Sequence, residues 1–507
     1  MSEIRIPGAE AAALAGMPEA SGASSGGMRR AVGGFAMLAV TTVGTQAIGF
    51  AALAITARRV GPINLGAYNF AYGLAFYFSL PVNFGIGLLG MRDIARARHR
   101  MSEVLGEVLV LQVMLIVVSY GALLALSPLI ANDHGSRVLL PVAGLAVVLF
   151  AATPDWPLQA AQRQRPVAVA RLAGQALFGV LAISLVSGGL GGIRTYAWVN
   201  IVGIVLTLAT CVGAAWRVGG RPRLSADAGR LWARLRSSAP IGLALLMGQI
   251  YLSLDSVLLG YLRGSGAVGQ YSVAYKLPLA LTAFTVLWTQ TLYPHAAELI
   301  DRRPDLVRRH LTTACGLTVL VSLPLGVGAT LVGGELMPAL FGSAFGPAGT
   351  PFILLVWSMA LTFVAATYVS ALMAAGEERS YAAGVSCATV VNVVLNVVLI
   401  PVAGATGAAA ATIVTQATVL GYVVWRTPVT LRPIAPEPRR VARTALASLA
   451  MAGVLLLARG VDVFPRIVLG MVVYALVALA VGSVRREELA EVLGHRGGSD
   501  RSNDVEG

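Results

Sequence analysis

Unbroken apolar runs, each about 20 residues long, constrain this 507-residue chain more than any other feature of its sequence. A run of that length crosses the hydrocarbon core of a bilayer as an α-helix, whereas a barrel strand needs about ten residues of alternating polarity. The charged fraction is 12%, against about a quarter in soluble proteins. The sequence therefore predicts an all-α polytopic membrane protein.

Fourteen runs are long enough to be candidate transmembrane helices. Their expected ranges are 35–57, 66–90, 104–127, 138–153, 171–187, 196–216, 240–262, 269–292, 311–332, 350–374, 381–400, 404–424, 442–459 and 465–484. Residues 1–33 are rich in Gly, Ala and Ser and contain no such run, so we expect a disordered cytoplasmic tail there. We expect a cytoplasmic linker at 219–239 and a second cytoplasmic tail at 485–507.

The arginines predict the orientation of these spans. If the N-terminus is cytoplasmic, 30 arginines fall in cytoplasmic segments and seven on the other side. Such a bias is the usual pattern of membrane proteins, and an even number of spans then leaves both termini in the cytoplasm. The net charge of +14 is explained by these loops, so we expect no nucleic-acid partner.

An internal repeat divides the chain into two halves. A set of residues recurs 203 positions further on, with Gln46, Gly61, Gly66, Tyr68 and Tyr72 matched by Gln249, Gly264, Gly269, Tyr271 and Tyr275. A second echo, at an offset of 214, matches Leu158, Ala160, Ala161 and Arg165 with Leu372, Ala374, Ala375 and Arg379. Because each repeat holds six spans, we expect two parallel six-helix lobes, 34–218 and 240–425, around a central cavity. Residues 426–484 lie outside the repeat and form a C-terminal helix pair.

Two charged residues lie within the apolar runs of the seventh and eighth expected spans. Asp255 falls in the seventh span, and Lys276, the only lysine in the chain, falls in the eighth. Both are about 8 to 10 Å below the expected outer surface, so they are able to pair. A charge within the membrane usually faces a bundle interior or a water-filled pathway. Lys276 is therefore a candidate contact for an anionic substrate with Asp255 as its exchangeable counter-ion; the alternative is a permanent structural ion pair.

Other candidate binding residues are arginine, amide and aromatic side chains. Arg58 and Arg59 break the arginine bias at the outer end of the first span, where they either bind an anionic head group or extend to the interface without a role. Gln46 and Gln249 occupy matched positions, so a cavity between two lobes would present both. Tyr72 and Tyr275 are able to stack on sugar rings, although aromatic residues near helix ends more often form an interfacial belt.

Several familiar motifs are absent or misleading. Gly85, Gly87 and Gly90 form a G-x-G-x-x-G pattern, but it ends a transmembrane span and has no βαβ unit around it. A P-loop is excluded because the only lysine is Lys276. Cys211, Cys315 and Cys387 form no C-x-x-C pair, so we expect neither a disulfide framework nor a metal or cofactor site.

The second half of the chain carries a resemblance to a known family. Gly376-Glu-Glu-Arg379 is followed by an Asn392-x-x-x-Asn396 helix and a Pro401-x-x-Gly404-x-x-Gly407 turn. With Arg59-Val-Gly-Pro62, Arg92-Asp-Ile-Ala-Arg96 and Asp155-Trp-Pro-Leu-Gln159, this pattern resembles the polysaccharide biosynthesis flippases of O-antigen transporter type, within the multidrug/oligosaccharidyl-lipid/polysaccharide exporter superfamily. The resemblance covers residues 35 to 425. The lipid II flippase branch is less similar, and the multidrug extrusion branch is more distant.

The resemblance implies a transporter and not an enzyme. Such a carrier turns undecaprenyl-pyrophosphate-linked oligosaccharide from the cytoplasmic to the periplasmic leaflet of the inner membrane, beside a polysaccharide polymerase and chain-length proteins. Alternatives are a cation-coupled multidrug extruder, which would need a carboxylate-rich cavity, a lipid II flippase, and a membrane-embedded glycosyltransferase, which would need a large outer loop with paired acids. A non-transporting scaffold would not require Lys276 within a span.

Overall fold

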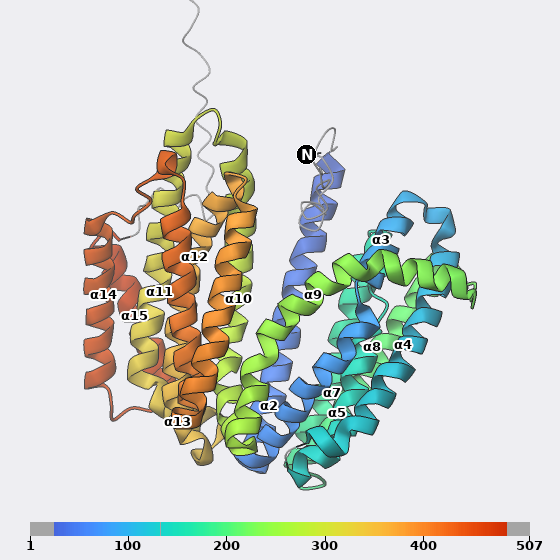
Figure 1. The fold of residues 1–507 in the computed structure, drawn as a ribbon. Coiled ribbons are helices and arrows are strands. Elements are labelled where there is room, and N and C mark those ends of the chain that lie inside the picture. The colour runs from blue at the N-terminus through green and yellow to red at the C-terminus, as the bar shows by residue number, and fades with distance from the viewer. Residues whose placement is uncertain (1–24, 132, 484–507) are drawn as a thin grey trace, which may run out of the picture.

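The computed structural model of the chain describes residues 25–131 and 133–483, in which all regular secondary structure is helical (Figure 1). The first half contains α2 (Ser25–Asn83), α3 (Ile86–Arg96), η1 (Arg98–Arg100), α4 (Met101–Ile130), α5 (His134–Ala151), α6 (Trp156–Ala160), α7 (Gln164–Ser187) and α8 (Ile193–Gly219). The second half contains α9 (Ala228–Arg263), α10 (Ser265–Leu299), α11 (Pro304–Phe341), η2 (Ser343–Ala348), α12 (Gly349–Ala374) and α13 (Glu378–Arg426). The chain continues through η3 (Val429–Leu431), α14 (Pro438–Leu457) and α15 (Val463–Ala480).

Within the described ranges, ten helical segments are long and apolar enough to cross a membrane. Two of them are pairs of helices, because Gly61 in α2 and Gly404 in α13 have non-helical backbone angles. Long helices α9 and α10 lie at two further expected spans. Helix is present in all fourteen predicted ranges, which confirms the all-α class, while fourteen membrane crossings stay a prediction.

Two predicted boundaries differ from the structure. Helix α2 begins at Ser25, inside the expected tail. The expected linker also ends inside a helix, because α9 continues from Ala228 through Pro240 into the seventh span. The linker half of α9 is held by Arg234, whose guanidinium lies 2.7 Å from Glu107 and 3.1 Å from Asp93. The remainder of the first tail and the tail at 485–507 fall outside the described residues.

The backbone confirms both echoes of the internal repeat. Gly61 has φ 73° and ψ 174°, and its counterpart Gly264 has φ 79° and ψ 177°. This left-handed conformation favours glycine and turns the chain sharply between two helices. At the second echo, Gln162 (φ 57°) matches Gly376 (φ 72°), and each follows a helix end closed by the same backbone hydrogen bonds. The two halves therefore share turn geometry at matched positions.

The two halves meet where the first echo lies. We call α2 to α8 the N-bundle, and α10 to α13 with the second half of α9 the C-bundle. A Cβ atom on Gly66 would overlap the Ser265 carbonyl, and one on the matched Gly269 would overlap the Pro62 carbonyl. These reciprocal contacts show that α2 and α10 cross backbone to backbone, as small residues permit in membrane helices.

This crossing defines two ends of the molecule. We call the end that holds Gly61 and Gly264 the closed end; the bundles lie side by side there and diverge toward the opposite, open end, where α2 begins (Figure 1). One buried apolar core includes Leu65 and Phe70 from the N-bundle and Phe341 and Phe345 from the C-bundle. The molecule is therefore held shut at one end only.

Helices α14 and α15 pack against α11 on the outside of the C-bundle (Figure 1). Arg466 of α15 is 1% exposed and forms an ion pair with Glu335 of α11. The Tyr474 hydroxyl donates to the Leu320 carbonyl, also on α11. The predicted helix pair is thus attached to one bundle and does not bridge the two.

Candidate functional site

The most polar group inside the C-bundle surrounds Asp255 of α9. Asn396 of α13 donates to Asp255 Oδ1 at 2.7 Å, and the Tyr271 hydroxyl of α10 donates to Oδ2 at 3.1 Å. The Thr412 hydroxyl lies 3.4 Å from the same Oδ2. Three helices therefore converge on one carboxylate, and all of its described hydrogen-bond partners are neutral.

A chain of amides extends this group along α13. Asn396 Nδ2 also donates to Asn392 Oδ1 at 3.0 Å, and Asn392 donates to the Thr415 hydroxyl at 3.2 Å. Asn392 and Asn396 are almost fully buried, and Asn396 Oδ1 has no hydrogen-bond partner among the described atoms. A buried carboxylate without a basic partner is stable only when a proton or a small cation neutralises it. The carboxylate, amide and hydroxyl oxygens here are suitable for either.

The expected ion pair between Asp255 and Lys276 is not formed. In the described part of the chain, Lys276 has no hydrogen bond or ion pair, while Asp255 is enclosed by the donors named above. The prediction of pairing was wrong because depth in the membrane does not give the direction of a side chain around its helix axis. The two charges belong to different environments.

The repeat indicates where Lys276 lies. Its counterpart is Gly73, whose Cβ position is 3.8 Å from Val257 of the opposite bundle. The counterpart of Val257 is Ala54, so the approximate two-fold relation places Lys276 beside the first half of α2, at the interface of the bundles. Helices α10 and α2 are in extensive contact, and Lys276 is partly buried. From the repeat we therefore expect the lone lysine to lie between the bundles.

The N-bundle lacks the charged group. The counterpart of Asp255 is Ala52, which is fully buried, and the counterpart of Tyr271 is Tyr68, whose hydroxyl accepts from Asn200 at 3.0 Å. The matched tyrosines thus keep a part-buried polar partner in both halves, an amide in one and a carboxyl group in the other. Of these two matched positions, 52 and 255, only the second carries a charge.

The predicted tyrosine and glutamine candidates have different surroundings in the structure. Tyr72 is part-buried and packs 6.0 Å from Tyr68, whereas Tyr275 stacks on Tyr271 at 5.9 Å with rings within 7° of parallel. Gln46 is exposed on α2. The side chain of Gln249 lies outside the described residues. Tyr275 adjoins Lys276 in sequence and its ring contacts the Asp255 group through Tyr271.

The outer arginines bind backbone carbonyls in the closed end. Arg58 of α2 donates to the carbonyls of Ala339 and Leu340, the latter at 2.8 Å, in the last turn of α11. Arg59 donates to the Ser187 carbonyl within its own bundle at 3.3 Å. A cation at a helix C-terminus is stabilised by the helix dipole and the unpaired carbonyls. Arg58 therefore connects the bundles in this state.

A second polar contact closes the same end. Ser265, at the start of α10, donates to Asp133, which precedes α5 and also accepts from the Ser136 backbone at 2.6 Å. Burial raises the pKa of Asp133, but the hydrogen bonds from Ser265 and Ser136 outweigh it, so the pKa is below its ordinary value. No sequence motif had indicated this contact.

Comparisons with known families and proteins give matches over about half of the chain. The family described as polysaccharide biosynthesis protein matches residues 31–300, more than half of the sequence. The chain belongs to this family. A probable flippase AglR of Haloferax volcanii is 27% identical over 48% of this chain and 53% of the relative. A putative O-antigen transporter of Escherichia coli K12 is 23% identical over 54% of this chain and 68% of the relative. The chain thus matches about half the length of the first of these curated relatives.

Solved structures agree with the fold. The lipid II flippase MurJ, in an inward closed conformation, has a TM-score of 0.70 at 14% identity and covers 89% of this chain and 99% of its own. An inward-facing multidrug resistance MATE transporter of the MOP superfamily has a TM-score of 0.58 at 15% identity, over 75% and 93%. At such identities the likeness shows the fold alone. The family member described here therefore has the two-bundle fold of these transporters.

Sequence reasoning identified Asp255 and Lys276 but missed the partners of Asp255. Asn392 and Asn396 are four residues apart and so share one helix face, which is the signal that points to the network. Thr412 carried no such signal. In the described residues no cluster of three or more His, Cys, Asp or Glu is able to hold a metal ion.

Proposed function

We propose that this family member is a flippase that moves a polyprenyl-pyrophosphate-linked oligosaccharide from the cytoplasmic to the periplasmic leaflet of a bacterial inner membrane. The observation that carries the proposal is that Lys276, a part-buried lysine on α10, has no anionic partner in the described chain, and the repeat relates its position to the interface of the bundles. An intramembrane charge at such a place marks a substrate pathway. An ammonium group is a good point-charge ligand for phosphate oxygens.

The transport cycle we propose is alternating access. The open end, which we assign to the cytoplasm from the arginine bias, admits the head group while the polyprenyl chain stays in lipid. Release requires the Gly66–Gly269 crossing and the Arg58 contacts to separate and the open end to close. A rigid-body movement of two bundles about a shared interface is a known class of such transitions.

The Asp255 group is our candidate for energy coupling. Binding of a proton or a monovalent cation neutralises the carboxylate, and its loss leaves a buried charge that the three converging helices must rearrange to solvate. Because Asp255 and Tyr271 are linked by a hydrogen bond and Tyr271 stacks on Tyr275, such a rearrangement reaches the residue beside Lys276. Coupling therefore has a short physical route to the substrate contact.

The decisive experiment measures translocation of lipid-linked oligosaccharide in cells that carry wild type, Lys276→Met or Lys276→Arg, with membrane protein levels matched. Met keeps the length of the side chain and removes the charge, whereas Arg keeps the charge. We expect Met to lower translocation by about 10- to 100-fold, the value of a lost hydrogen bond to a charged group, and Arg to retain most of it. Equal activity of all three variants would refute the role of Lys276.

The same cells separate the rival functions. A cation-coupled drug extruder would lower accumulation of a cationic dye in wild-type cells, and Lys276→Met would increase that effect by removing a like charge. A lipid II flippase would sustain peptidoglycan precursor translocation when the host flippase is depleted. Either result, without oligosaccharide translocation, would replace the proposed substrate.

A further inference from the structure

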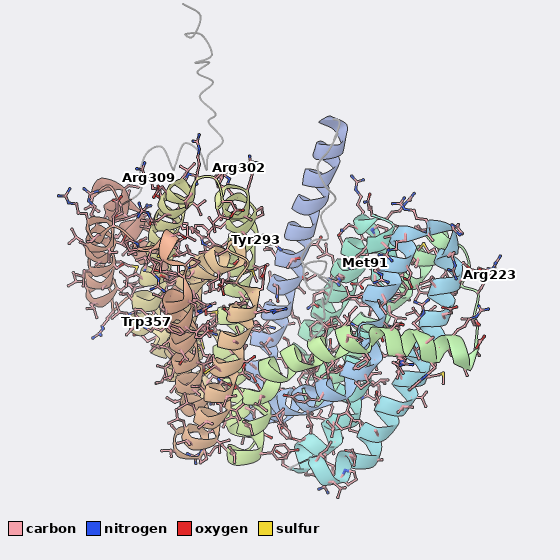
Figure 2. All side chains as sticks on the ribbon, turned by 45° about the horizontal axis from the view of Figure 1, so that its top comes forward. Met91, Arg223, Tyr293, Arg302, Arg309 and Trp357 are labelled. Atoms are coloured by element: carbon pink, nitrogen blue, oxygen red, sulfur yellow. The ribbon has the colours of Figure 1, made fainter. Side chains whose placement is uncertain are left out.

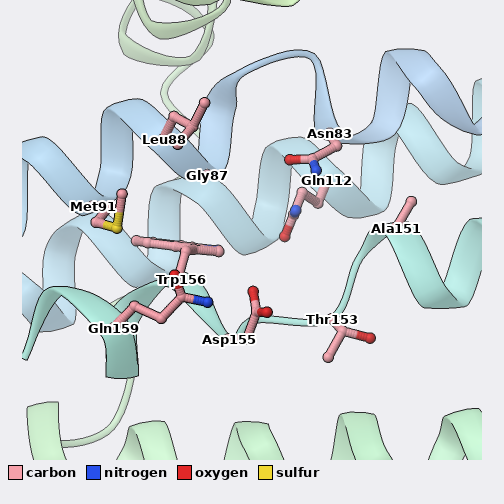
Figure 3. A pocket seen from close by; sticks show the side chains of 10 residues that line it. All are labelled: Asn83, Gly87, Leu88, Met91, Gln112, Ala151, Thr153, Asp155, Trp156 and Gln159. Atoms are coloured by element: carbon pink, nitrogen blue, oxygen red, sulfur yellow. The ribbon is translucent and has the colours of Figure 1, made fainter. Parts of the chain in front are cut away.

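A polar pocket lies within the N-bundle, away from the Asp255 and Lys276 groups. Its volume is about 140 Å³, and Figure 3 shows the side chains around it. It is lined by the last residue of α2, the exposed side of α3, the middle of α4 and the segment from α5 to α6. Since a water molecule occupies about 30 Å³ in the liquid, the pocket has room for about five waters or one face of a small ring.

The glycine pattern read in the sequence explains how the pocket is built. Cβ atoms on Gly87 or Gly90 would press on the indole ring of Trp156, so these glycines allow α3 to lie flat against that ring. Gly85 has φ 72° and permits the turn from α2 into α3. The pattern is thus a docking surface for an aromatic side chain and has no relation to nucleotide binding.

Two buried polar groups in the lining have no partner among the described atoms. Gln112 is 2% exposed and its Oε1 accepts no hydrogen bond, and Trp156 is 7% exposed and its Nε1 donates none. A buried polar atom without a partner costs about 1 to 3 kcal/mol, so each requires compensation from a bound molecule. One is an acceptor and the other a donor, and both side chains lie among those that line the pocket in Figure 3.

The remaining lining decides which class of ligand fits. Asn83 and Gln159 add amides, which both donate and accept. Asp155 is the one carboxylate of the lining, and it is already in an ion pair with Arg171. The pocket therefore has neither a free cation for a phosphate nor a free anion for an ammonium group. Hydroxyl groups, which also donate and accept, are the complement of such a surface.

We infer that this pocket is a subsite for one monosaccharide unit, held by hydroxyl hydrogen bonds to Gln112, Asn83, Gln159 and the Trp156 indole. The inference rests on the proposed function, because it assigns a sugar-selecting site to the carrier beside the phosphate contact at Lys276. Met91, at its rim, lies on the side of the N-bundle nearest the C-bundle, opposite Tyr293 (Figure 2). A sugar entering at the open end is thus within reach of the pocket.

The internal repeat indicates that the polar lining of the pocket is specific to the N-bundle. At the offset of 214, Ser370 occupies the position of Trp156, and Met373 that of Gln159. The backbone turn is the same in both copies, but the C-bundle lacks the indole and the amide. The polar lining is therefore not needed to make the turn.

The test is binding of free monosaccharides to the full chain in lipid nanodiscs, observed by saturation-transfer NMR. The probes are glucose, galactose, N-acetylglucosamine, rhamnose and glucuronic acid. We expect at least one to receive saturation at millimolar concentration, and Gln112→Leu, Gln159→Leu and Trp156→Phe each to reduce the signal several-fold. Gln164→Leu, the same substitution at an exposed position five residues beyond Gln159, serves as the matched control and should leave the signal unchanged.

A second measurement, protection of an introduced cysteine from alkylation, tests the subsite if the binding variants fold poorly. With the native cysteines replaced by serine, Gln159→Cys is alkylated by a maleimide, and the binding sugar should slow that reaction several-fold while leaving Gln164→Cys unaffected. No saturation transfer and no protection for any probe would overturn the inference and leave a solvent-filled pocket. Sugar binding without oligosaccharide translocation would refute the proposed function and keep the subsite. Translocation without sugar binding would refute the subsite and keep the proposed function.

Discussion

At the scale of single residues, the protein treats its two intramembrane charges in opposite ways. Asp255 accepts hydrogen bonds from side chains of two other helices, α10 and α13, whereas Lys276 has no hydrogen bond or ion pair in the described chain. Desolvation without partners is costly for either ion, so these environments serve different purposes. One retains a small neutralising ion or proton, and the other remains available to an anionic substrate.

We predict that Asp255→Asn preserves the fold and removes coupling. Asparagine has nearly the same shape, and its carbonyl still accepts from Asn396, so the melting temperature should be unchanged or higher once the buried charge is gone. Translocation should lose its dependence on pH and on sodium. Asn396→Leu is the contrasting variant, since it leaves the carboxylate with fewer donors and should lower the melting temperature. A large loss of stability in Asp255→Asn would instead assign Asp255 a structural role.

We also predict that Gln162→Gly stabilises the protein. Gln162 has φ 57°, a conformation that costs an L-residue about 1 to 2 kcal/mol, and its repeat counterpart is already Gly376. Loss of this strain, offset in part by the greater backbone entropy of glycine, should increase the free energy of unfolding by about 0.5 to 1 kcal/mol. The control Gln164→Gly, within α7, should act in the opposite direction. Thermal unfolding in detergent measures both.

At the scale of helices, the closed end depends on contacts that are tight but few. The α2–α10 crossing is backbone to backbone at Gly66, whereas Gly73, two turns further along α2, has its nearest neighbour at ordinary contact distance. The same helix therefore offers one glycine, Gly66, that does not tolerate a methyl group and another, Gly73, that does.

We predict that Gly66→Ala opens or destabilises the closed end while Gly73→Ala does not. A methyl group at Gly66 must displace the Ser265 backbone, at a cost of about 1 to 3 kcal/mol. Cysteine cross-linking between the starts of α5 and α10 should become slower in the Gly66 variant. Equal cross-linking rates in both variants would show that the crossing does not hold the bundles together.

The Asp133–Ser265 contact predicts a dependence on external pH. Because the pKa of Asp133 is lowered in the closed state, the contact stabilises that state above the ordinary aspartate pKa and loses this effect as pH falls through the lowered value. Acidification should therefore favour opening at this end, and Asp133→Asn should abolish that response. His134 is adjacent and its charge acts on Asp133, so His134→Gln is the control. A response that persists in Asp133→Asn would exclude this carboxylate as its source.

At the scale of the whole molecule, two bundles joined at one end imply a movement at the other. Met91 and Tyr293 lie on facing sides of the open end (Figure 2). Spin labels at these two positions should report a shorter distance when the closed end is weakened by Arg58→Ala, because the bundles rotate about their shared interface. Labels at Glu335 and Arg459 should keep their distance, since both positions lie in one attached unit. An unchanged distance between Met91 and Tyr293 would argue against alternating access.

The sequence by itself determined the elements of this protein. Helix length, orientation bias and the glycine turns follow from local chemistry, because a backbone in lipid must satisfy its own hydrogen bonds and a sharp turn requires glycine. For that reason the all-α class and the repeat, with its matched turns at Gly61 and Gly264, are confirmed, while the fourteen crossings stay a prediction. The family resemblance is confirmed as well, since its motifs are contiguous in the chain.

The tertiary structure alone decided which side chains meet. Asp255 bonds to Asn396 and Thr412, more than 140 residues away, and Arg58 reaches carbonyls 281 and 282 residues away. Such contacts depend on the rotation of each helix about its axis, which mutual packing sets and which depth in the membrane does not reveal. The expected Asp255–Lys276 pair failed for this reason. The pocket at Trp156 became visible only when two glycines of α3, an amide of α4 and an indole of α6 were brought together.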